Sequence, residues 1–395
     1  MKSGSSFPGK KSYYNLLTNQ TMPKVLVIAG EASGDLHGGH VLKELKQLRP
    51  DLELIGTGGK LISELGAELY YRVEELAVIG FFEVAKRYSY YKGIFNNIVA
   101  KLDQEKPDAV FLVDYAGFNL KLAVEAKKRG IKVIFYVAPQ VWAWKKKRIE
   151  VLKEYVDELI VLFPFEVDFF RKEGMETHCF GHPLLDIVKP DINKNKLMEK
   201  WQLDSGKKHV CLMPGSRVNE VTKHLPLLFE TAAKLNEKTE NVQFLIPLAP
   251  TVKPETIQPF LNQYSLDLKV VYDDTYNTVA HSDFALVASG TATLETAILG
   301  TPEVIYYKSS IITYLIGKYL LRIKMIGLPN IIANEMLVPE DPHFVAPGKM
   351  ADRIARYLNN ENLYASFKNN LGVVKSKLGE AGAYKKTAEF VNSLL

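Results

Sequence analysis

The chain has 395 residues, more than one ordinary domain needs and enough for two domains of usual size. Hydrophobic residues make up 47% of it and charged residues 24%, values typical of a globular protein. The formal net charge is +5, and Lys2, Lys10 and Lys11 lie within the first 21 positions, so the composition disfavours a nucleic-acid-binding protein.

Three further features limit the class of protein. Residues 1–21 are polar and lack the apolar core of a signal peptide, so we interpret them as a disordered extension or an expression remnant. Cys179 and Cys211 lie beside predicted strands without CxxC spacing, which favours two buried thiols in a reducing compartment. No run of about 20 uncharged apolar residues exists, so the sequence predicts no membrane-spanning helix.

The first element is the apolar run Val25–Ala29, which predicts a strand covered on both faces. A glycine-rich turn over 30–39 and a helix over 40–48 are expected to follow, as in the first turn of a doubly wound sheet. The spacing is not GxGxxG, and Glu31 and Asp35 would repel a pyrophosphate. Tight packing of helix on strand therefore explains these glycines about as well as a ligand does.

The segment from Glu74 to Ile98 is rich in aromatic and aliphatic side chains, interleaved with Lys86, Arg87 and Lys92. A core helix explains such a stripe, because aromatic stripes are usually buried. The alternative is an apolar surface with a basic fringe, suited to anionic lipid or to acyl chains. For that alternative the candidate lipid-contacting residues are Val78, Ile79, Phe81, Phe82, Tyr88 and Tyr91.

Asp114 stands at the end of the apolar run Ala109–Val113, which predicts another buried strand. Ligands bind at the carboxyl ends of parallel strands in this kind of sheet, so Asp114 is the leading candidate for a general base. Its alternative role is to cap the helix that follows. His182, directly before a proline, is interpreted as a structural hydrogen-bonding residue rather than a base.

A second alternating pattern begins after the polar, proline-containing run 189–196, which is the best candidate for a linker. Its first strand, over 209–213, is followed by Pro214-Gly215-Ser216-Arg217 and a helical pattern. Backbone amides at a helix N-terminus and a forked guanidinium both suit a diphosphate. Ser216 and Arg217 are therefore predicted to bind one.

The strand expected over 284–288 ends in Ser289, Gly290 and Thr291, small residues that again offer amide donors to phosphate at a helix start. Glu295 lies one turn further, where a carboxylate can accept the hydroxyls of a ribose. The sequence contains no DxD pair, HExxH motif or Cys/His cluster, so neither a metal nor another cofactor is expected. An arginine and helix termini would stabilise a leaving diphosphate instead.

Together these elements predict an α/β protein with two Rossmann-like domains that face a central cleft. The first domain, over 22–188, is expected to carry the acceptor and the catalytic base. The second, over 189–350, is expected to bind the nucleotide, and C-terminal helices are expected over 351–395.

The order of these motifs resembles that of the lipid-A-disaccharide synthases, glycosyltransferases of the two-Rossmann (GT-B) type. Each shared stretch alone is weak, whereas so many in this order are highly specific, and they cover nearly everything after Met22. The stretches are Gly30–Asp35, Glu75–Gly80, Val113-Asp114 with Phe118-Asn119, Tyr136 with Pro139 and Val141–Trp144, Pro164–Glu166, Gly181-His182, Pro214–Arg217 with Glu220, Ala288–Ala292 with Leu294-Glu295, and Leu328–Asn330.

The resemblance implies transfer of 2,3-diacylglucosamine from its UDP derivative to 2,3-diacylglucosamine 1-phosphate, in lipopolysaccharide biosynthesis. The products would be the β(1→6) lipid A disaccharide and UDP. Inversion at the donor carbon in one displacement needs a base for the acceptor 6-hydroxyl, and the resemblance assigns that role to Asp114. It implies Arg217 and residues 289–291 for the diphosphate, Glu295 for the ribose and Asn330 for the uridine. Glu31, Ser33, Gly34 and Asn119 would line the acceptor side of the cleft.

Other expectations rest on the resemblance alone. A member of this family would be cytoplasmic and peripheral on the anionic inner membrane of a Gram-negative-type bacterium, and would form a homodimer with exchanged C-terminal segments. One position departs from the family pattern Asp-x-Pro-Asp-Phe-Asn, because Gly117 stands where a second carboxylate is usual. Either Asp114 is the base by elimination, or this protein is impaired.

Two rival classes remain. One is another two-Rossmann sugar-nucleotide enzyme, such as an N-acetylglucosamine transferase or a UDP-N-acetylglucosamine 2-epimerase. An epimerase needs several acid and base groups round the sugar and no lipid surface. The other is a non-catalytic protein that binds lipid or nucleotide.

Overall fold

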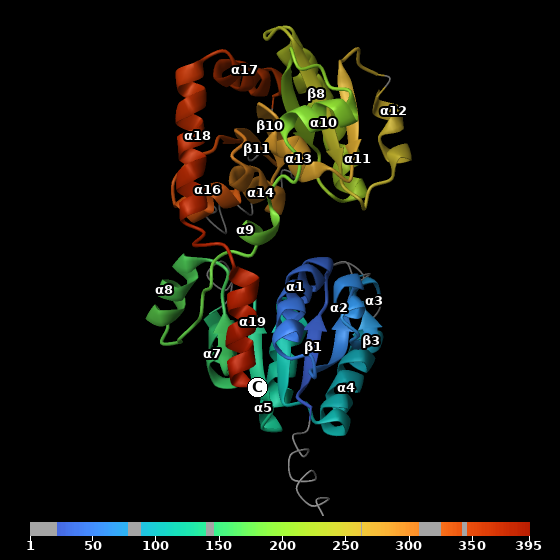
Figure 1. The fold of residues 1–395 in the computed structure, drawn as a ribbon, viewed down its shortest axis with the longest axis vertical. Coiled ribbons are helices and arrows are strands. Elements are labelled where there is room, and N and C mark those ends of the chain that lie inside the picture. Colours follow the sequence, from blue (N-terminus) through green and yellow to red (C-terminus); the bar gives the residue numbers. More distant parts are fainter. Residues whose placement is uncertain (1–21, 78–87, 140–145, 262, 308–324, 342–345) are drawn as a thin grey trace, which may run out of the picture. The chain divides into compact units, whose positions relative to one another are not determined.

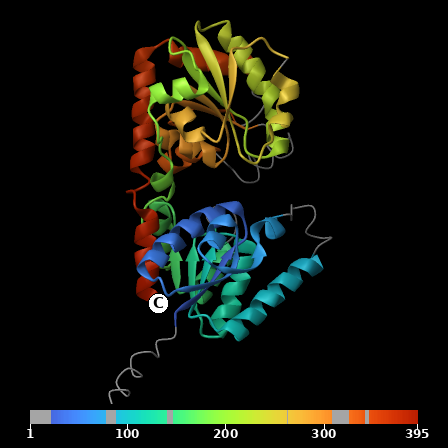
Figure 2. The ribbon, with the colours of Figure 1, turned by 45° about the vertical axis from the view of Figure 1, so that its right-hand side comes forward.

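The computed structural model describes residues 22–77, 88–139, 146–261, 263–307, 325–341 and 346–395, and the chain forms two compact units (Figure 1). The first unit comprises Met1–Val161, Phe170–His178 and Tyr384–Leu395. The second comprises Leu162–Phe169 and Cys179–Ala383. Helices cover both faces of the sheet in each unit, as the turned view shows (Figure 2).

The sheet of the first unit has six parallel strands in the order β3-β2-β1-β4-β5-β6. They are β1 (Lys24–Ala29), β2 (Glu53–Gly58), β3 (Glu68–Arg72), β4 (Ala109–Val113), β5 (Lys132–Tyr136) and β6 (Glu158–Ile160). The central strands β1, after its first residue Lys24, and β4 are buried because helices lie on both faces.

The sheet of the second unit has the order β12-β11-β10-β7-β8-β9, and its strand pairs are also parallel. The strands are β7 (Lys208–Met213), β8 (Val242–Leu248), β9 (Leu268–Tyr272), β10 (Phe284–Ala288), β11 (Glu303–Tyr306) and β12 (Glu340–Asp341). Numbered within its own unit, each sheet runs 3-2-1-4-5-6, the Rossmann order. The predicted α/β fold with two Rossmann-like domains is confirmed.

Most helices connect consecutive strands within their own unit. In the first unit they are α1 (Ala32–Leu48), α2 (Lys60–Glu64), α3 (Val73–Ala77), α4 (Tyr88–Glu105), α5 (Ala116–Lys128), α7 (Lys146–Tyr155) and α19 (Ala383–Leu394), while α8 (Pro164–Lys172) is divided between the units. In the second they are α9 (Leu184–Ile187), α10 (Lys194–Trp201), α11 (Val218–Asn236), η2 (Pro254–Thr256), α12 (Gln258–Leu261), α13 (Thr275–Ala280), α14 (Thr291–Leu299), α16 (Leu328–Ala333), α17 (Pro347–Leu358) and α18 (Glu361–Ser376).

Helix α1 begins at Ala32, although the glycine-rich sequence predicts a turn up to residue 39. The glycines are needed for packing. A Cβ built on Gly38 would lie 3.0 Å from Cγ2 of Val113, and one on Gly39 would lie 2.7 Å from Cβ of Leu61. Helix propensity disfavours glycine, but only glycine lets α1 approach the sheet and α2 this closely.

Asp35 is a structural residue rather than part of an anion site. Its buried carboxylate accepts hydrogen bonds from the amides of Gly59 (2.7 Å), Leu61 (3.0 Å) and Ile62 (3.1 Å), at the start of α2. These amides have no partner inside a helix, so the carboxylate satisfies them and ties α1 to α2.

The run 189–196 packs within the second unit, whereas the sequence suggests a linker. Asn277 accepts hydrogen bonds from the amides of Asp191 and Ile192, and Asn193 caps α10 through the amide of Lys196. Its polar residues therefore serve turns and a helix cap. Residues 328–330 begin α16, and Pro329 stands in its first turn, where proline is tolerated.

The last helix, α19, belongs to the first unit, in red among its blue and green elements (Figure 1). The hydroxyl of Tyr384 lies 2.8 Å from Nδ1 of His37 on α1, and the ring of Phe390 packs 4.2 Å from that of His178. Ala388 and Val391 are buried on the same helix. The C-terminal helices thus divide between the two units.

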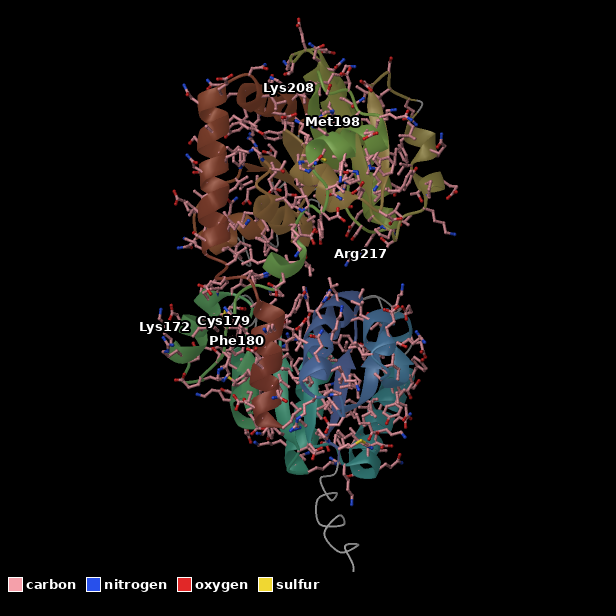
Figure 3. All side chains as sticks on the ribbon, viewed as in Figure 1. Lys172, Cys179, Phe180, Met198, Lys208 and Arg217 are labelled. Atoms are coloured by element: carbon pink, nitrogen blue, oxygen red, sulfur yellow. The ribbon has the colours of Figure 1, made fainter. Side chains whose placement is uncertain are left out.

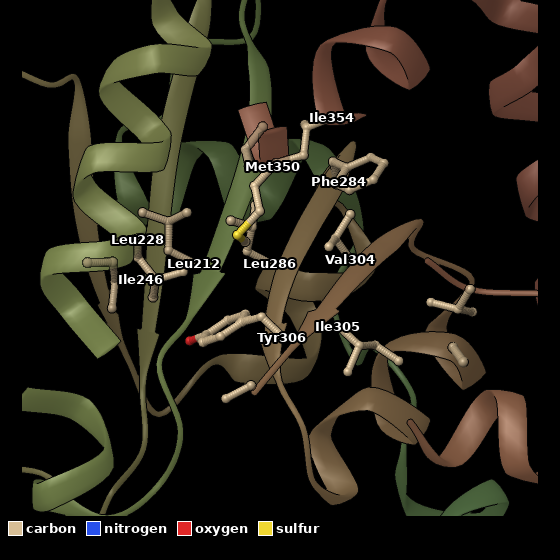
Figure 4. Close-up of a cluster of buried hydrophobic side chains, with 14 of the residues drawn as sticks. Leu212, Leu228, Ile246, Phe284, Leu286, Val304, Ile305, Tyr306, Met350 and Ile354 are labelled. Atoms are coloured by element: carbon tan, nitrogen blue, oxygen red, sulfur yellow. The ribbon is translucent and has the colours of Figure 1, made fainter. Parts of the chain in front are cut away.

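The core of the second unit follows the alternation of its strands. Leu212 and Leu286 share one face of the sheet with Leu228 of α11 and Met350 of α17, as the close-up shows (Figure 4). Neighbouring residues such as Cys211 point to the other face, against α10 and α13. A central strand such as β10 is therefore apolar on both sides, which makes its carboxyl end the place where polar side chains can collect.

Glu303 is an exception to this apolar interior. It lies on β11 with no exposed surface, and neither carboxylate oxygen has a hydrogen-bond partner in the described part of the chain. Burial raises its pKa well above the usual value.

We expect Glu303→Gln to remove a loss of folding stability that grows as pH rises. The folded state keeps a proton that the unfolded chain releases above about pH 4.5, so the wild type loses about 1.4 kcal/mol of unfolding free energy per pH unit from there up to the folded pKa. In urea unfolding between pH 5 and pH 8, the free energy of unfolding of E303Q relative to that of the wild type should increase as pH rises. Exposed Glu230→Gln is the control, and a pH-independent difference for E303Q would contradict the prediction.

Candidate active site

The second unit carries a pocket of about 760 Å³ at the carboxyl ends of β7 and β10. Strand order reverses between these two strands, which is where doubly wound sheets bind ligands. The pocket brings together the predicted residues Ser216, Arg217, Ser289, Gly290, Thr291 and Glu295. Its complete lining is Met213–Arg217, Asn219, Glu220, Lys223, His224, Pro247, Ala249, Pro250, Thr275, Tyr276, Ala288–Ala292, Glu295 and Tyr307.

One wall is the turn between β7 and α11. Gly215 has a φ of +113°, and a Cβ there would lie 2.8 Å from Oε2 of Glu220, so the turn requires glycine. Arg217 immediately precedes α11, and its side chain, 80% exposed, projects from the ribbon (Figure 3). Its Nη1 lies 2.7 Å from Oε1 of Glu220. Such an exposed pair contributes little stability, so the guanidinium can exchange this carboxylate for a phosphate.

The opposite wall is the start of α14. Gly290 immediately precedes the helix, and its carbonyl accepts the hydroxyl of Thr293 at 2.8 Å. Ser289 donates its hydroxyl to the carbonyl of Ile326 at 2.9 Å, while Thr291 is exposed. The pocket therefore lies against the N-termini of two helices, α11 and α14, and both favour negative charge.

Glu295 forms a hydrogen-bonded pair with Tyr276 at the pocket lining. The Tyr276 hydroxyl donates to Oε1 of Glu295 at 3.2 Å. Burial raises the pKa of Glu295, and this hydrogen bond acts in the opposite direction. The pair offers acceptor oxygens suited to a vicinal diol such as that of ribose.

Asn330 does not line this pocket. It is fully buried, and its Nδ2 donates to the carbonyl of Val338 at 2.7 Å. Its Oδ1 accepts the amides of Leu337 and Val338, both at 2.8 Å. These contacts fold the segment after α16 onto β12, so a role at the uridine stays a prediction.

In the first unit, Asp114 lies at the carboxyl end of β4, beside β1, where the strand order of that sheet reverses. Asp114 and Tyr115 both have left-handed backbones, with φ of +49° and +47°. Burial, with a smaller contribution from the negative charge of Glu31, raises the pKa of Asp114 to about 6. The residue at the cap position before α5 is Tyr115, whose side chain makes no capping hydrogen bond, so the capping role considered for Asp114 is wrong.

The four predicted cleft residues fall into two groups. Glu31 and Ser33 are exposed at the start of α1, whereas Gly34 and Asn119 are buried. Asn119 donates through Nδ2 to the carbonyls of Asp114 (2.8 Å) and Val113 (3.2 Å). Asn119 therefore holds the backbone that carries Asp114.

Most of the predicted lipid-contacting stripe lies outside the described residues. This is the case for Val78, Ile79, Phe81 and Phe82, and for the side chain of Tyr88. Tyr91 is half-buried, with its ring edge-on to Phe118 at 6.4 Å. Further along α4, Ile94 and Ile98 are buried, so this half of the stripe contributes one face to the core.

Some pocket residues were not predicted from the sequence. His224 lies seven residues after Arg217, at helical spacing on the same face of α11, so projecting the helix from Arg217 would have found it. No comparable signal marks Tyr276, because its position depends on how α13 packs against α14.

Two kinds of feature are absent from the described ranges. Within them, no group of three or more His, Cys, Asp and Glu side chains is arranged to hold a metal ion. None of the helices there has the length and apolar character that crossing a membrane requires.

Two Rossmann-like units, the second with a pocket at the carboxyl ends of its central strands, define a GT-B-type fold. Several solved structures share the fold over nearly the whole chain: S. aureus MnaA with UDP (TM-score 0.62, 14% identity, 95% of this chain and 98% of that one), the UDP-GlcNAc 2-epimerase from Neisseria meningitidis bound to UDP-GlcNAc (0.61, 14%, 94% and 98%), and the glycotransferase of kitacinnamycin (0.61, 12%, 95% and 100%). At these identities they show the fold alone.

The chain belongs to the lipid-A-disaccharide synthetase family, whose family model matches residues 25–380. The lipid-A-disaccharide synthase of Geobacter sulfurreducens is 38% identical over 383 residues, which are 96% of this chain and 99% of that protein. The Coxiella burnetii protein of the same name is 38% identical over 372 residues (94% and 98%). Lipid-A-disaccharide synthase 1 of Legionella pneumophila is 36% identical over 365 residues (91% and 94%). The predicted family is confirmed.

We expect Glu31→Gln to lower the pKa of Asp114 from its value of about 6, because a negative charge that opposes ionisation is removed. Burial remains, so the pKa should stay above the usual 3.8 of aspartate. NMR titration of ¹³C-carboxyl-labelled aspartates measures this, with Asp114→Asn for assignment. Glu53→Gln, at the opposite end of the sheet, is the control, and an unchanged titration in E31Q would contradict the electrostatic contribution.

Proposed function

We propose that this protein joins UDP-2,3-diacylglucosamine to 2,3-diacylglucosamine 1-phosphate, forming the β(1→6) lipid A disaccharide and UDP. The observation that carries the proposal is the pocket at the ends of β7 and β10, because two helix N-termini, Arg217 and Glu295 converge there. Family membership, through relatives named lipid-A-disaccharide synthase, supports the choice of sugar and acceptor.

On the donor side, the diphosphate would lie between the N-termini of α11 and α14, with Arg217 on its oxygens. The exposed side chain of Arg217 and the glycine turn beside it support this assignment. Glu295 would accept the ribose hydroxyls. As the glycosidic bond to UDP breaks, these groups would stabilise the charge that develops on the leaving diphosphate.

Asp114 is the proposed general base. Its carboxylate would take the proton of the acceptor 6-hydroxyl while that oxygen attacks the donor carbon and UDP leaves, which inverts the configuration there. A pKa of about 6 supports the role, because such a group is largely ionised at neutral pH and is more basic than an ordinary aspartate. The mechanism requires the first unit to present Asp114 to the sugar held by the second, and this arrangement stays a prediction.

An assay for UDP release tests the reaction. We expect UDP to form from UDP-2,3-diacylglucosamine only when the acylated acceptor phosphate is present. A UDP-N-acetylglucosamine 2-epimerase activity would instead need no acceptor, and acceptor-independent turnover would overturn the proposal.

Metal independence is part of the proposal, so EDTA should leave the rate unchanged, and strong inhibition would reveal a required metal.

We expect Asp114→Asn to reduce turnover by at least about 10², the usual lower contribution of a general base. Isosteric replacement keeps the shape of the site, so UDP should still bind normally, as measured by isothermal titration calorimetry. Asp108→Asn, on the residue before β4, is a matched control expected to retain activity. A near-normal rate in D114N would remove Asp114 from the mechanism.

A peripheral position on an anionic membrane is also proposed, through the stripe 78–95. Tyr90, in the described half of that stripe, supports it because its aromatic side chain is 47% exposed. A homodimer with exchanged C-terminal segments rests on the resemblance alone. In this structure α19 packs against the first unit of its own chain.

Co-sedimentation with phospholipid vesicles tests the membrane proposal. We expect binding to vesicles that contain anionic lipid and weaker binding to zwitterionic ones, because a basic fringe adds electrostatic attraction to apolar contact. Tyr90→Ser should weaken binding. Protein that stays in the supernatant with anionic vesicles would count against this surface.

A further inference from the structure

The turn between β7 and α11 has three backbone carbonyls that are held by side chains from three other segments. The Tyr306 hydroxyl, from β11, donates to the carbonyl of Met213 at 3.2 Å. Nδ1 of His224, from α11, lies 2.7 Å from the carbonyl oxygen of Pro214 and donates to it. The hydroxyl of Thr251, after β8, donates to the carbonyl of Ser216.

These hydrogen bonds determine the direction of the amides in the turn. In a trans peptide the carbonyl of one residue and the N–H of the next point in opposite directions. The N–H of Gly215 therefore points away from the His224 ring, and that of Arg217 points away from Thr251. In the described part of the chain, no protein group accepts a hydrogen bond from the amides of Gly215, Ser216 or Arg217.

Pro214 fits this arrangement because it has no N–H. The peptide between Met213 and Pro214 is fixed by its carbonyl alone, so the Tyr306 hydrogen bond sets the direction in which the chain leaves β7. The next residue, Gly215, then adopts its left-handed φ of +113°. Side-chain hydrogen bonds therefore hold the turn on both sides of Gly215, at Met213 and Pro214 before it and at Ser216 after it.

The two rings that hold the turn are buried and pack against each other. Tyr306 has no exposed surface and His224 is 5% exposed. Their rings meet edge to face, with centroids 5.2 Å apart. Figure 4 shows the Tyr306 ring extending from β11 toward the strand that carries Leu212. Because both rings are packed in the core, they hold the carbonyls more rigidly than an exposed side chain would.

We propose that Tyr306 and His224 are positioning residues for the diphosphate. Tyr306 lies outside the pocket lining and His224 lies in it, and both act by fixing the carbonyls of Met213 and Pro214, so that the turn presents the amide of Gly215 to phosphate oxygens before the ligand arrives. This inference rests on the proposed function, since it assumes that a nucleoside diphosphate occupies the pocket.

The variant Tyr306→Phe tests it, because the ring contact remains and only the hydroxyl is lost. Tyr364→Phe is the matched control. The Tyr364 hydroxyl donates to the carbonyl of Asp283 at 3.0 Å in the same unit, and Tyr364 does not line the pocket. Binding of UDP is measured by calorimetry and binding of uridine by competition NMR, with thermal unfolding of each variant as the measure of stability.

We expect Y306F to bind UDP about tenfold more weakly than wild type, the effect of one lost positioning hydrogen bond, and to bind uridine equally well. Both tyrosine variants should lose similar stability, whereas Y364F should bind UDP normally. If the Tyr306 hydroxyl were only structural, Y306F would lose stability, but its affinity for UDP relative to uridine would not change.

Two results would overturn the inference alone. One is UDP binding by Y306F at wild-type affinity, and the other is an equal loss for UDP and uridine. If wild-type protein itself fails to bind UDP, the proposed function fails and the inference fails with it. Should Y306F not fold, His224→Phe is measured in its place, with the same expectation of weaker UDP binding and unchanged uridine binding.

Discussion

The reversal of strand order at the centre of each sheet is the constraint on which the rest of this protein depends. Apolar strands covered on both faces carry few polar groups along their length, so such groups collect where the chain leaves the sheet. Asp114 follows β4 in the first unit, and the turn with Arg217 follows β7 in the second. In both units polar or small residues also follow the neighbouring central strand, Glu31 after β1 and Ser289-Gly290 after β10. The geometry of the sheet thus selects the four segments in which the proposed chemistry resides.

The backbone that carries the Asp114 carboxylate is strained, and neighbouring residues hold it in place. Two successive left-handed residues, Asp114 and Tyr115, cost on the order of 1–2 kcal/mol each. Asn119 offsets this by holding two carbonyls of the bend, and the Tyr115 ring occupies the space over Gly30, where a Cβ would lie 2.3 Å from it. A Cβ built on Gly117, by contrast, meets no atom of the described residues within 4 Å. The structure therefore offers no steric reason for the missing family carboxylate at that position.

Sequence reasoning succeeded where one local pattern determines the structure. The apolar runs before Gly30, Asp114, Pro214 and Ser289 are strands, and the residues after the last two do line one pocket. It failed where tertiary contacts override local preference: glycines that favour a turn are helical in α1 because neighbours approach closely, and the polar run 189–196 is held by Asn277, far away in sequence. Tyr276 was missed for the same reason. The fold itself also does not separate a transferase from an epimerase, since solved structures of both share it; sequence relatives make that distinction.

The position of α19 has a consequence for how the protein is made. The first unit contains the earliest strands of the chain and also its last helix, with Tyr384, Ala388 and Val391 buried against it. A ribosome delivers residues in order, and domains generally fold as units as they emerge. Here the second unit can be complete while the first still lacks part of its core. The first unit therefore stays unfinished until α19 has been made.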